Sequence, residues 1–177
     1  MILRVEPLTA EAFAPFGEVI EADARHLSFP VNAGTSQRFH DLARLDPGPD
    51  GRLIVSIFRA QPRPLPFTLA LLERHPLASQ AFVPLNGTPF LVVVAPRGES
   101  IAPASVRAFL AQGHQGINFA PGVWHHPLLA LGRVCDFLVI DRDDPDGNCE
   151  ERVLAQALHV APEQLSVPST RKETAPC

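Results

Sequence analysis

The sequence predicts a mainly β protein, folded as one barrel-like domain with a few short helices. Its nineteen prolines are about twice the usual frequency of roughly 5%. Proline is excluded from helix interiors and sits at strand edges and turns, so this content favours short strands joined by rigid corners. The apolar runs are also of strand length, and most are bounded by Gly, Pro or Asn. Many short strands with few helices indicate an antiparallel sandwich or barrel.

The first expected element is a short helix over residues 10–14. Thr9 precedes it, and the Thr9 hydroxyl can accept a hydrogen bond from an early amide of the helix, while Glu11 favours the positive N-terminal end. After this helix the apolar runs have the length of strands. Each is expected to form one: residues 18–20, 53–58, 67–72, 81–85, 90–95 and 134–140.

Two later segments are expected to be helical. They are residues 105–110 and 148–158, the second with Asn148 as its N-cap and two glutamates in its first turn. The C-terminal region is polar and interrupted by prolines without periodicity, which predicts a flexible tail. We therefore expect a single domain over residues 1–160, followed by the tail 161–177.

Composition and charge limit the classes of partner. The net charge is −4 and the basic residues are scattered, so no surface for nucleic acid is expected. No apolar stretch approaches the roughly 18 residues of a membrane span, and no signal peptide is recognisable, so no membrane partner is expected. The three cysteines are odd in number and widely separated, which favours a reducing compartment. These features predict a cytoplasmic protein.

The segment 73–87 carries polar side chains at regular spacing. Glu73 and His75 are two residues apart, so on a strand both point to one side, and Gln80 can return to that side on the next strand. The segment resembles the first cupin motif: Glu73 and His75 take the positions of two ligand histidines, Gln80 that of a glutamate and Gly87 that of a closing glycine. Polar groups that converge in the mouth of a barrel form a site.

The segment 115–127 resembles the second cupin motif, in which a Pro-Gly turn precedes a ligand histidine. Gly122 and His125 keep the spacing of that motif. His125 and His126 are adjacent, so on a strand they face opposite sides and only one of them can enter a barrel. We expect His125 to face the interior.

The two motifs together supply a candidate set of metal ligands. Imidazole nitrogens and carboxylate oxygens bind divalent transition metals, whereas an amide oxygen is a weak ligand. The set departs from metal-binding cupins, because a Glu and a Gln replace a His and a Glu, so the residues leave metal dependence open. The candidate ligands are Glu73, His75, Gln80 and His125.

Over residues 1–160 the chain resembles the ureidoglycolate lyase family through several separated strings, more than chance would produce. The segment 119–121, Phe-Ala-Pro, departs from the family, where a more polar aromatic residue and a basic residue are expected. The matching strings are NAGTSQRFH at 32–40, ERHP at 73–76, SQAF at 79–82, QGIN at 115–118, GVWHHPL at 122–128, DFLV at 136–139, DR at 141–142 and NCEE at 148–151.

This resemblance implies a cupin-like β-barrel enzyme, a carbon-nitrogen lyase of the amidine-lyase type. Such an enzyme cleaves (S)-ureidoglycolate to glyoxylate and urea in allantoin and purine degradation. The resemblance also implies a homodimer and makes a divalent metal such as nickel the candidate cofactor. Two alternatives stay open on sequence alone. One is an amidohydrolase that releases ammonia from ureidoglycolate, and the other is a non-catalytic cupin that binds a small carboxylic acid.

Elimination of urea requires a cation for the substrate carboxylate, a base for the hydroxyl proton and an acid for the leaving nitrogen. Arg38 and Arg74 are the candidate carboxylate ligands, because a guanidinium group recognises carboxylates in a planar, bidentate manner. The candidate base is His125, because histidine titrates near neutral pH, or Glu73, if burial makes its carboxyl more basic. Three polar side chains are expected to orient the hydroxyl and urea groups: Ser36, Gln80 and Asn118.

Overall fold

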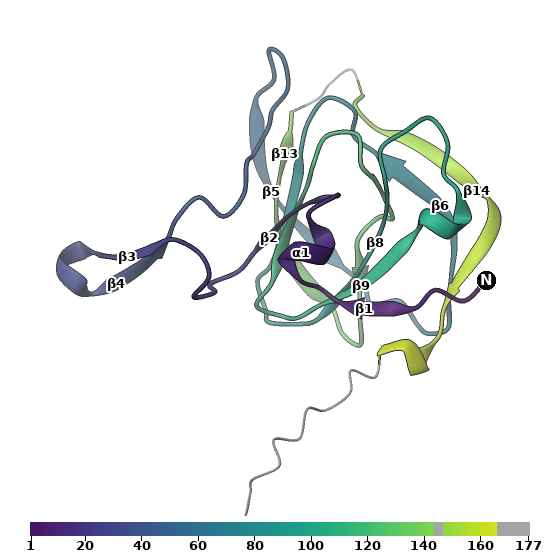
Figure 1. Ribbon diagram of the computed structural model, residues 1–177, viewed down its shortest axis with the longest axis horizontal. Helices are drawn as coiled ribbons and strands as arrows, with labels where there is room; N and C mark the ends of the chain where they lie inside the picture. The colour runs from purple at the N-terminus through teal and green to yellow at the C-terminus, as the bar shows by residue number, and fades with distance from the viewer. Residues whose placement is uncertain (144–146, 166–177) are drawn as a thin grey trace, which may run out of the picture.

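The structure is a computed structural model that describes residues 1–143 and 147–165. Its strands form two large sheets and one separate hairpin. The two large sheets curl toward each other, and Figure 1 shows their strands encircling a common interior. The mainly β, barrel-like fold predicted from the sequence is confirmed.

The larger sheet has seven strands in the order β1-β9-β8-β11-β6-β14, with β12 beside β8. β1 runs parallel to β9, and the other pairs of this sheet are antiparallel. The strands are β1 (Val5–Pro7), β6 (Phe67–Arg74), β8 (Phe90–Ala95), β9 (Arg107–Ala111), β11 (Trp124–His125), β12 (Leu129–Ala130) and β14 (Glu150–Val160).

The smaller sheet has five strands, all paired antiparallel in the order β2-β10-β7-β13-β5. They are β2 (Gly17–Ile20), β5 (Leu53–Ala60), β7 (Gln80–Pro84), β10 (Gly116–Phe119) and β13 (Cys135–Arg142). The hairpin consists of β3 (Ser28–Val31) and β4 (Ser36–Phe39), belongs to neither sheet and extends away from the barrel (Figure 1).

The helical elements are all short. None of those in the described part of the chain has the length and hydropathy needed to cross a lipid bilayer. The Thr9 hydroxyl accepts a hydrogen bond from the Ala12 amide at 3.2 Å, so the predicted N-cap of the first helix is confirmed. The elements are α1 (Ala10–Phe13) and three 3-10 turns, Asn32–Gly34, Pro103–Ser105 and Pro162–Leu165.

The strand β8 is buried on both faces and separates two apolar clusters. Phe90, Val92 and Val94 face the barrel interior, where they pack with aromatic side chains of both sheets. Leu91 and Val93 face a second cluster, formed with leucines of β6 and β14. A strand buried on both faces has a continuous apolar sequence without alternation, as this one does.

Part of the predicted C-terminal tail is ordered. Residues 162–165, at the start of the predicted tail, form a 3-10 turn whose Leu165 packs against the second apolar cluster. The rest of the predicted tail, residues 166–177, lies outside the described residues.

Six strands lie where the sequence predicted them. Residues 18–20, 53–58, 67–72, 81–85, 90–95 and 134–140 correspond to β2, β5, β6, β7, β8 and β13, in that order.

The helix predicted over residues 105–110 is wrong, because this segment forms β9 between β1 and β8. Phe109 faces the interior cluster and Ala108 faces the second one, so both sides of the strand are buried. A short apolar run that is buried on both sides has no periodicity to distinguish a strand from a buried helix. Pairing with two neighbouring strands decides in favour of the strand.

The helix predicted over residues 148–158 is also wrong, because the chain there forms β14, paired antiparallel with β6. A register shift within β14 interrupts the pairing and leaves buried Leu154 and Leu158 four residues apart. A spacing of four residues fits one face of a helix as well as one side of a strand. Asn148 caps no helix, and its side-chain oxygen instead accepts a hydrogen bond from the Leu77 amide at 2.9 Å.

We predict that Leu158→Ala lowers the free energy of unfolding by about 3 kcal/mol, because Leu158 is fully buried and its truncation leaves a cavity. The matched control on the same strand is Val153→Ala. It should change the free energy of unfolding by less than about 0.5 kcal/mol, because Val153 is 78% exposed. Urea-induced unfolding of both variants measures the difference. Equal effects of the two substitutions would contradict the packing of β14 over the second cluster.

Candidate functional site

The pairing of β6 with β11 places one residue from each sequence motif in the barrel interior. His125 lies directly opposite Glu73 across this antiparallel pair, and His125 Nε2 is 3.5 Å from Glu73 Oε1. Side chains alternate along a strand. The neighbours Arg74 and Trp124 accordingly face the other way, where the guanidinium group lies 4.6 Å from the centroid of the Trp124 ring.

His75 follows the end of β6 and joins these two residues. Its ring centroid lies 5.3 Å from that of His125, and one ligand atom from each of Glu73, His75 and His125 lies within 4.8 Å of the others. We call these three residues the Glu-His-His cluster. The Gly122 amide donates to the His75 carbonyl at 2.8 Å, and Gly122 has a φ of +76°, which glycine adopts without strain. The two motifs therefore meet in one place.

Both histidines of the cluster direct an unprotonated nitrogen into it. His75 Nδ1 lies 2.8 Å from the carbonyl oxygen of Asn148, and His125 Nδ1 lies 3.0 Å from that of Val123. A carbonyl oxygen only accepts hydrogen bonds, so Nδ1 carries the proton in each neutral ring and Nε2 presents a lone pair. Neither Nε2 atom has a hydrogen-bond partner among the described residues, although both are buried.

While both rings are neutral with the proton on Nδ1, the cluster is therefore a set of acceptors without a donor. Each buried acceptor that lacks a partner costs about 1–3 kcal/mol. A divalent cation would satisfy all three groups, and imidazole with carboxylate suits Ni, Zn or Fe. Carbonyl oxygens that bind the far ring nitrogens are the usual support for histidine ligands. The residues thus fit a metal ion. Gln80, whose Oε1 is buried and has no partner among the described residues, lines the same cavity as His75.

Burial and mutual charge set the protonation of the cluster. Burial raises the pKa of Glu73, but the interaction with His125 and the charge of the nearby imidazoles lower it by more, so the carboxyl has a pKa below its ordinary value. Burial lowers the pKa of His75, and the charge of His125 lowers it further. Near neutral pH Glu73 is ionised and His75 is uncharged. Both can then accept a proton or a metal ion.

Phe119 on β10 forms one wall of the cluster. Its ring stacks on His125 with 4.2 Å between the centroids and an angle of 14° between the planes. This contact fixes the plane of the imidazole, and His125 is only 2% exposed. Phe119 begins the segment that departs from the family pattern, so an apolar ring here contacts a residue of the cluster directly.

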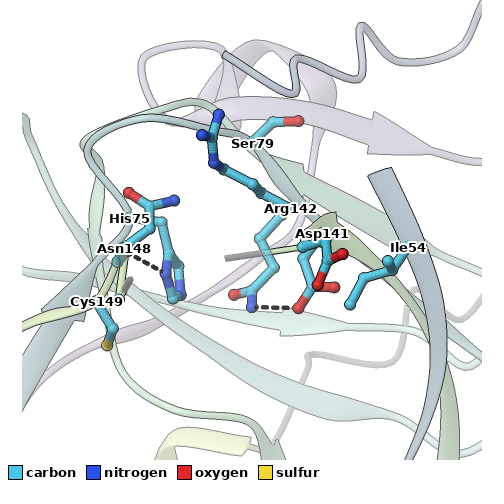
Figure 2. Close-up of a pocket in the computed structure, with 10 residues that line it drawn as sticks. Ile54, His75, Ser79, Asp141, Arg142, Asn148 and Cys149 are labelled. Carbon is cyan, nitrogen blue, oxygen red and sulfur yellow. Dashed lines mark hydrogen bonds between the residues drawn. The ribbon is translucent and has the colours of Figure 1, made fainter. Parts of the chain in front are cut away.

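A cavity of about 440 Å³ lies beside the cluster, a volume that suits a small metabolite. Figure 2 shows His75 and Asn148 on one side of it and Asp141 on the other, with Arg142 between them. Gln80 Nε2 donates to Asp141 Oδ2 at 3.5 Å. A second cavity, of about 490 Å³, is lined by Glu73 and Gln80 among others. Gln80 therefore contributes to both cavities.

Two residues predicted to bind substrate make contacts within the fold. Arg74 Nε donates to the Glu150 carboxylate at 2.8 Å, and Arg74 Nη1 donates to the Gly98 carbonyl at 2.9 Å. The Asn118 amide donates to the Glu18 carboxylate at 2.9 Å and to a backbone carbonyl at 3.0 Å. Neither Arg74 nor Asn118 lines the cavity beside the cluster.

Two further predicted substrate ligands, Ser36 and Arg38, are exposed residues of β4. The Arg38 guanidinium lies 5.9 Å from the ring centroid of Phe29 on the paired strand β3. Figure 1 shows that this hairpin projects from the barrel rather than covering its interior. A single chain therefore brings together only part of the predicted site: Glu73, His75, Gln80 and His125.

The sequence did not identify three residues that line the cavity, Ser79, Asp141 and Arg142. The available signal was an Asp-Arg pair directly after the apolar run at 134–140. Pairing of β13 with β7 brings that pair beside the cluster. Such a contact between distant segments cannot be read from local spacing.

A β-barrel whose interior holds two histidines and a carboxylate beside a cavity of this size defines a protein that binds small molecules, with a ligand set suited to a metal ion. The chain belongs to the ureidoglycolate lyase family, because the family model for ureidoglycolate lyase matches residues 1–161.

Individual proteins are similar to the chain over most of its length. A ureidoglycolate lyase from Burkholderia cepacia is 59% identical over 153 residues, which cover 85% of each chain. A ureidoglycolate lyase from Burkholderia mallei (strain NCTC 10229) is 52% identical over 164 residues, which cover 92% of this chain and 95% of that protein. Among solved structures, a dTDP sugar isomerase from Desulfovibrio desulfuricans G20 aligns with a TM-score of 0.46 and 19% identity, covering 78% of this chain and 85% of that one.

We predict that His75 and His125 carry their proton on Nδ1 in the metal-free protein, at a pH where the rings are neutral, because each Nδ1 faces a carbonyl oxygen. Long-range ¹H–¹⁵N correlation spectra distinguish a protonated from an unprotonated ring nitrogen. His159 is the control: its Nδ1 lies 3.1 Å from the Thr68 hydroxyl, which can donate or accept. A proton on Nε2 of either cluster histidine would contradict the interpretation that the Glu-His-His cluster presents only hydrogen-bond acceptors.

Proposed function

We propose that the protein is a ureidoglycolate lyase, which cleaves (S)-ureidoglycolate to glyoxylate and urea in allantoin and purine degradation. The observation that carries this proposal is the Glu-His-His cluster, in which His125 is buried and Glu73 and His75 are half-buried, and whose acceptor atoms meet beside a cavity of small-molecule size. Membership of the family supports the choice of substrate, and two relatives, at 59% and 52% identity, are named ureidoglycolate lyase. The reaction is that of a carbon-nitrogen lyase.

The substrate loses one proton and takes up one proton during the reaction, so the protein supplies none overall. A base takes the hydroxyl proton of the substrate, and the electrons of that O–H bond form the carbonyl of glyoxylate. The bond between the carbon and the urea nitrogen then breaks, and this nitrogen takes up a proton. Glu73 and His125 are the candidate bases, because each presents an acceptor atom and these atoms lie 3.5 Å apart. The group that receives the proton can return it to the departing nitrogen.

A divalent metal ion, with nickel as the candidate, is part of this proposal. When bound, such an ion acts as a Lewis acid that polarises a substrate oxygen. The chain prepares the site through the carbonyls of Val123 and Asn148, which hold both Nε2 atoms unprotonated. Phe119 keeps the imidazole plane of the buried histidine fixed. The proposed ligands are Glu73, His75, His125 and Gln80. A nitrogen whose lone pair binds a metal ion cannot also take a proton, so with the ion bound to His125 the base would be Glu73, through its other carboxylate oxygen.

The proposal also includes a homodimer. The β3–β4 hairpin pairs with neither large sheet, and a two-stranded hairpin alone is at best marginally stable in water. Packing against a second copy of the chain would bury its apolar side chains and those of the sheet-edge strand β5. It would also be the route by which Arg38 and Ser36 reach a substrate. The exposed large apolar residues in and beside the hairpin and in β5 are Leu27, Phe29, Val55, Ile57 and Phe58.

We predict that the purified protein, given freshly prepared ureidoglycolate, releases urea and glyoxylate in equal amounts. Removal of bound metal by a chelator should lower turnover at least about tenfold, and added nickel should restore it, because a Lewis acid supplies several kcal/mol of stabilisation to the transition state. Release of ammonia in place of urea would identify an amidohydrolase, and binding without turnover would identify a non-catalytic cupin. Full turnover after chelation would remove the metal from the proposal.

We predict that His125→Ala lowers kcat by about 10² to 10⁴, because the substitution removes either the base or a ligand of the metal ion. The matched control is His126→Ala, which should leave kcat within about threefold, less than 1 kcal/mol in barrier. His126 lies outside the cluster: its ring packs edge-on against Phe67 at 5.3 Å between centroids, and its Nδ1 lies 2.7 Å from the Pro127 carbonyl. Thermal unfolding shows whether both variants fold. An inactive His126→Ala beside an active His125→Ala would place the chemistry on the opposite face of the strand.

A further inference from the structure

Arg142, the last residue of β13, brings a guanidinium group into the cavity beside the Glu-His-His cluster. Its Nη1 donates to the carbonyl oxygens of Pro47 and Pro49, at 2.6 and 3.1 Å. These two bonds hold one corner of the group against the backbone. The guanidinium is therefore in place before a ligand binds, which reduces the entropy lost on binding.

The other edge of this guanidinium has no hydrogen-bond partner among the described residues. Arg142 Nε is buried and has no hydrogen-bond partner, and Nη2 makes no hydrogen bond to the described residues. Nε–H and Nη2–H together form the fork with which arginine binds a carboxylate through two parallel hydrogen bonds. A buried donor without an acceptor costs about 1–3 kcal/mol, and an anionic ligand would remove that cost.

The charges around the cavity leave this cation available. Asp143 forms an ion pair with Arg52, and Asp141 accepts a hydrogen bond from Gln80. Figure 2 shows the Arg142 guanidinium directed away from the Asp141 carboxylate. Among the described residues that line this cavity, Arg142 is the only arginine or lysine. An acid that enters the cavity therefore has one permanent positive charge to bind.

We propose that Arg142 binds the carboxylate of the substrate through Nε–H and Nη2–H, and so orients the reacting carbon toward the Glu-His-His cluster. This inference rests on the proposed function and names the residue that selects a carboxylate-bearing substrate. Gln80 and Asp141 line the same cavity, and each has a buried oxygen without a partner among the described residues, Oε1 and Oδ1. These oxygens are acceptors for the N–H groups of the ureido end. The donors and acceptors of the cavity thus match a small acid that carries a ureido group.

The two arginines predicted from the sequence are less suited to this role. Arg74 already binds Glu150 and the Gly98 carbonyl, and it stacks on Trp124 outside the barrel interior. Arg38 is exposed on the hairpin and would have to come from a second copy of the chain. Arg142 is available within the same chain as the cluster.

Calorimetric binding to the purified full-length chain tests the proposal with two probes. Glyoxylate carries a carboxylate, and glycolamide is an uncharged molecule of similar size. Arg142→Gln should weaken glyoxylate binding at least about tenfold, equivalent to 1.4 kcal/mol, and leave glycolamide binding within about twofold. Arg142→Lys should fall between this variant and the wild type, because a point charge keeps the attraction but loses the fork.

Arg107→Gln is the matched control for loss of an arginine that anchors the backbone. Arg107 Nη1 donates to the Ala12 carbonyl at 3.0 Å, and Nη2 donates to Glu6 at 2.8 Å, away from this cavity. Its substitution should leave glyoxylate binding unchanged. Arg38→Gln tests the competing arginine. Loss of glyoxylate binding in Arg38→Gln, with retention in Arg142→Gln, would overturn the proposal.

Two further outcomes would also overturn the proposal. One is equal weakening of glyoxylate and glycolamide by Arg142→Gln, which would indicate a structural role. The other is a wild-type protein that binds glyoxylate no more tightly than glycolamide. Urea release by the wild type reports separately on the proposed function. If the wild type binds glyoxylate through Arg142 but releases no urea, the carboxylate site stands and the proposed reaction fails.

Discussion

The pairing of β6 with β11 is the constraint on which the rest of the site depends. It sets Glu73 opposite His125, and strand alternation then directs Arg74 and Trp124 to the second apolar cluster. A shift by one residue would exchange these sets and place an ion-paired arginine and an indole in the barrel interior. The outward residues oppose such a shift, because Arg74 binds Glu150 on β14 and the Trp124 indole donates to a backbone carbonyl at 2.8 Å.

The site is maintained at a cost in folding free energy. Buried polar atoms without partners gather around the cluster and its cavity, and each costs about 1–3 kcal/mol when nothing is bound. The two apolar clusters on either side of β8 supply the burial that offsets this cost. A natural protein departs from full hydrogen bonding mainly where function requires it. The unpartnered atoms near the site are Nε2 of His75 and His125, Oε1 of Gln80, Oδ1 of Asp141 and Nε of Arg142.

The sequence predicted the barrel and the core of the cluster, because both depend on local regularities. Strand-length apolar runs indicated the sheets, and the resemblance of two segments to cupin motifs, supported by the two-residue spacing, indicated Glu73, His75 and His125. The predictions failed where a local pattern fits two structures. In residues 148–158, an Asn followed by two glutamates resembles the start of a helix, but the segment forms β14. The position of Arg142 beside the cavity could not be predicted, because it follows from contacts between β13, the turn at 47–49 and β7.

Anomalous diffraction at the nickel edge, from crystals grown with nickel, measures most directly whether the barrel interior is the metal site. The predicted result is one dominant peak within coordination distance of Glu73 and of Nε2 of His75 and His125. The exposed histidine His114 and the half-buried His159, whose ring bonds to a hydroxyl, provide internal references outside the barrel interior. A peak at either of these, with none at the cluster, would contradict the account.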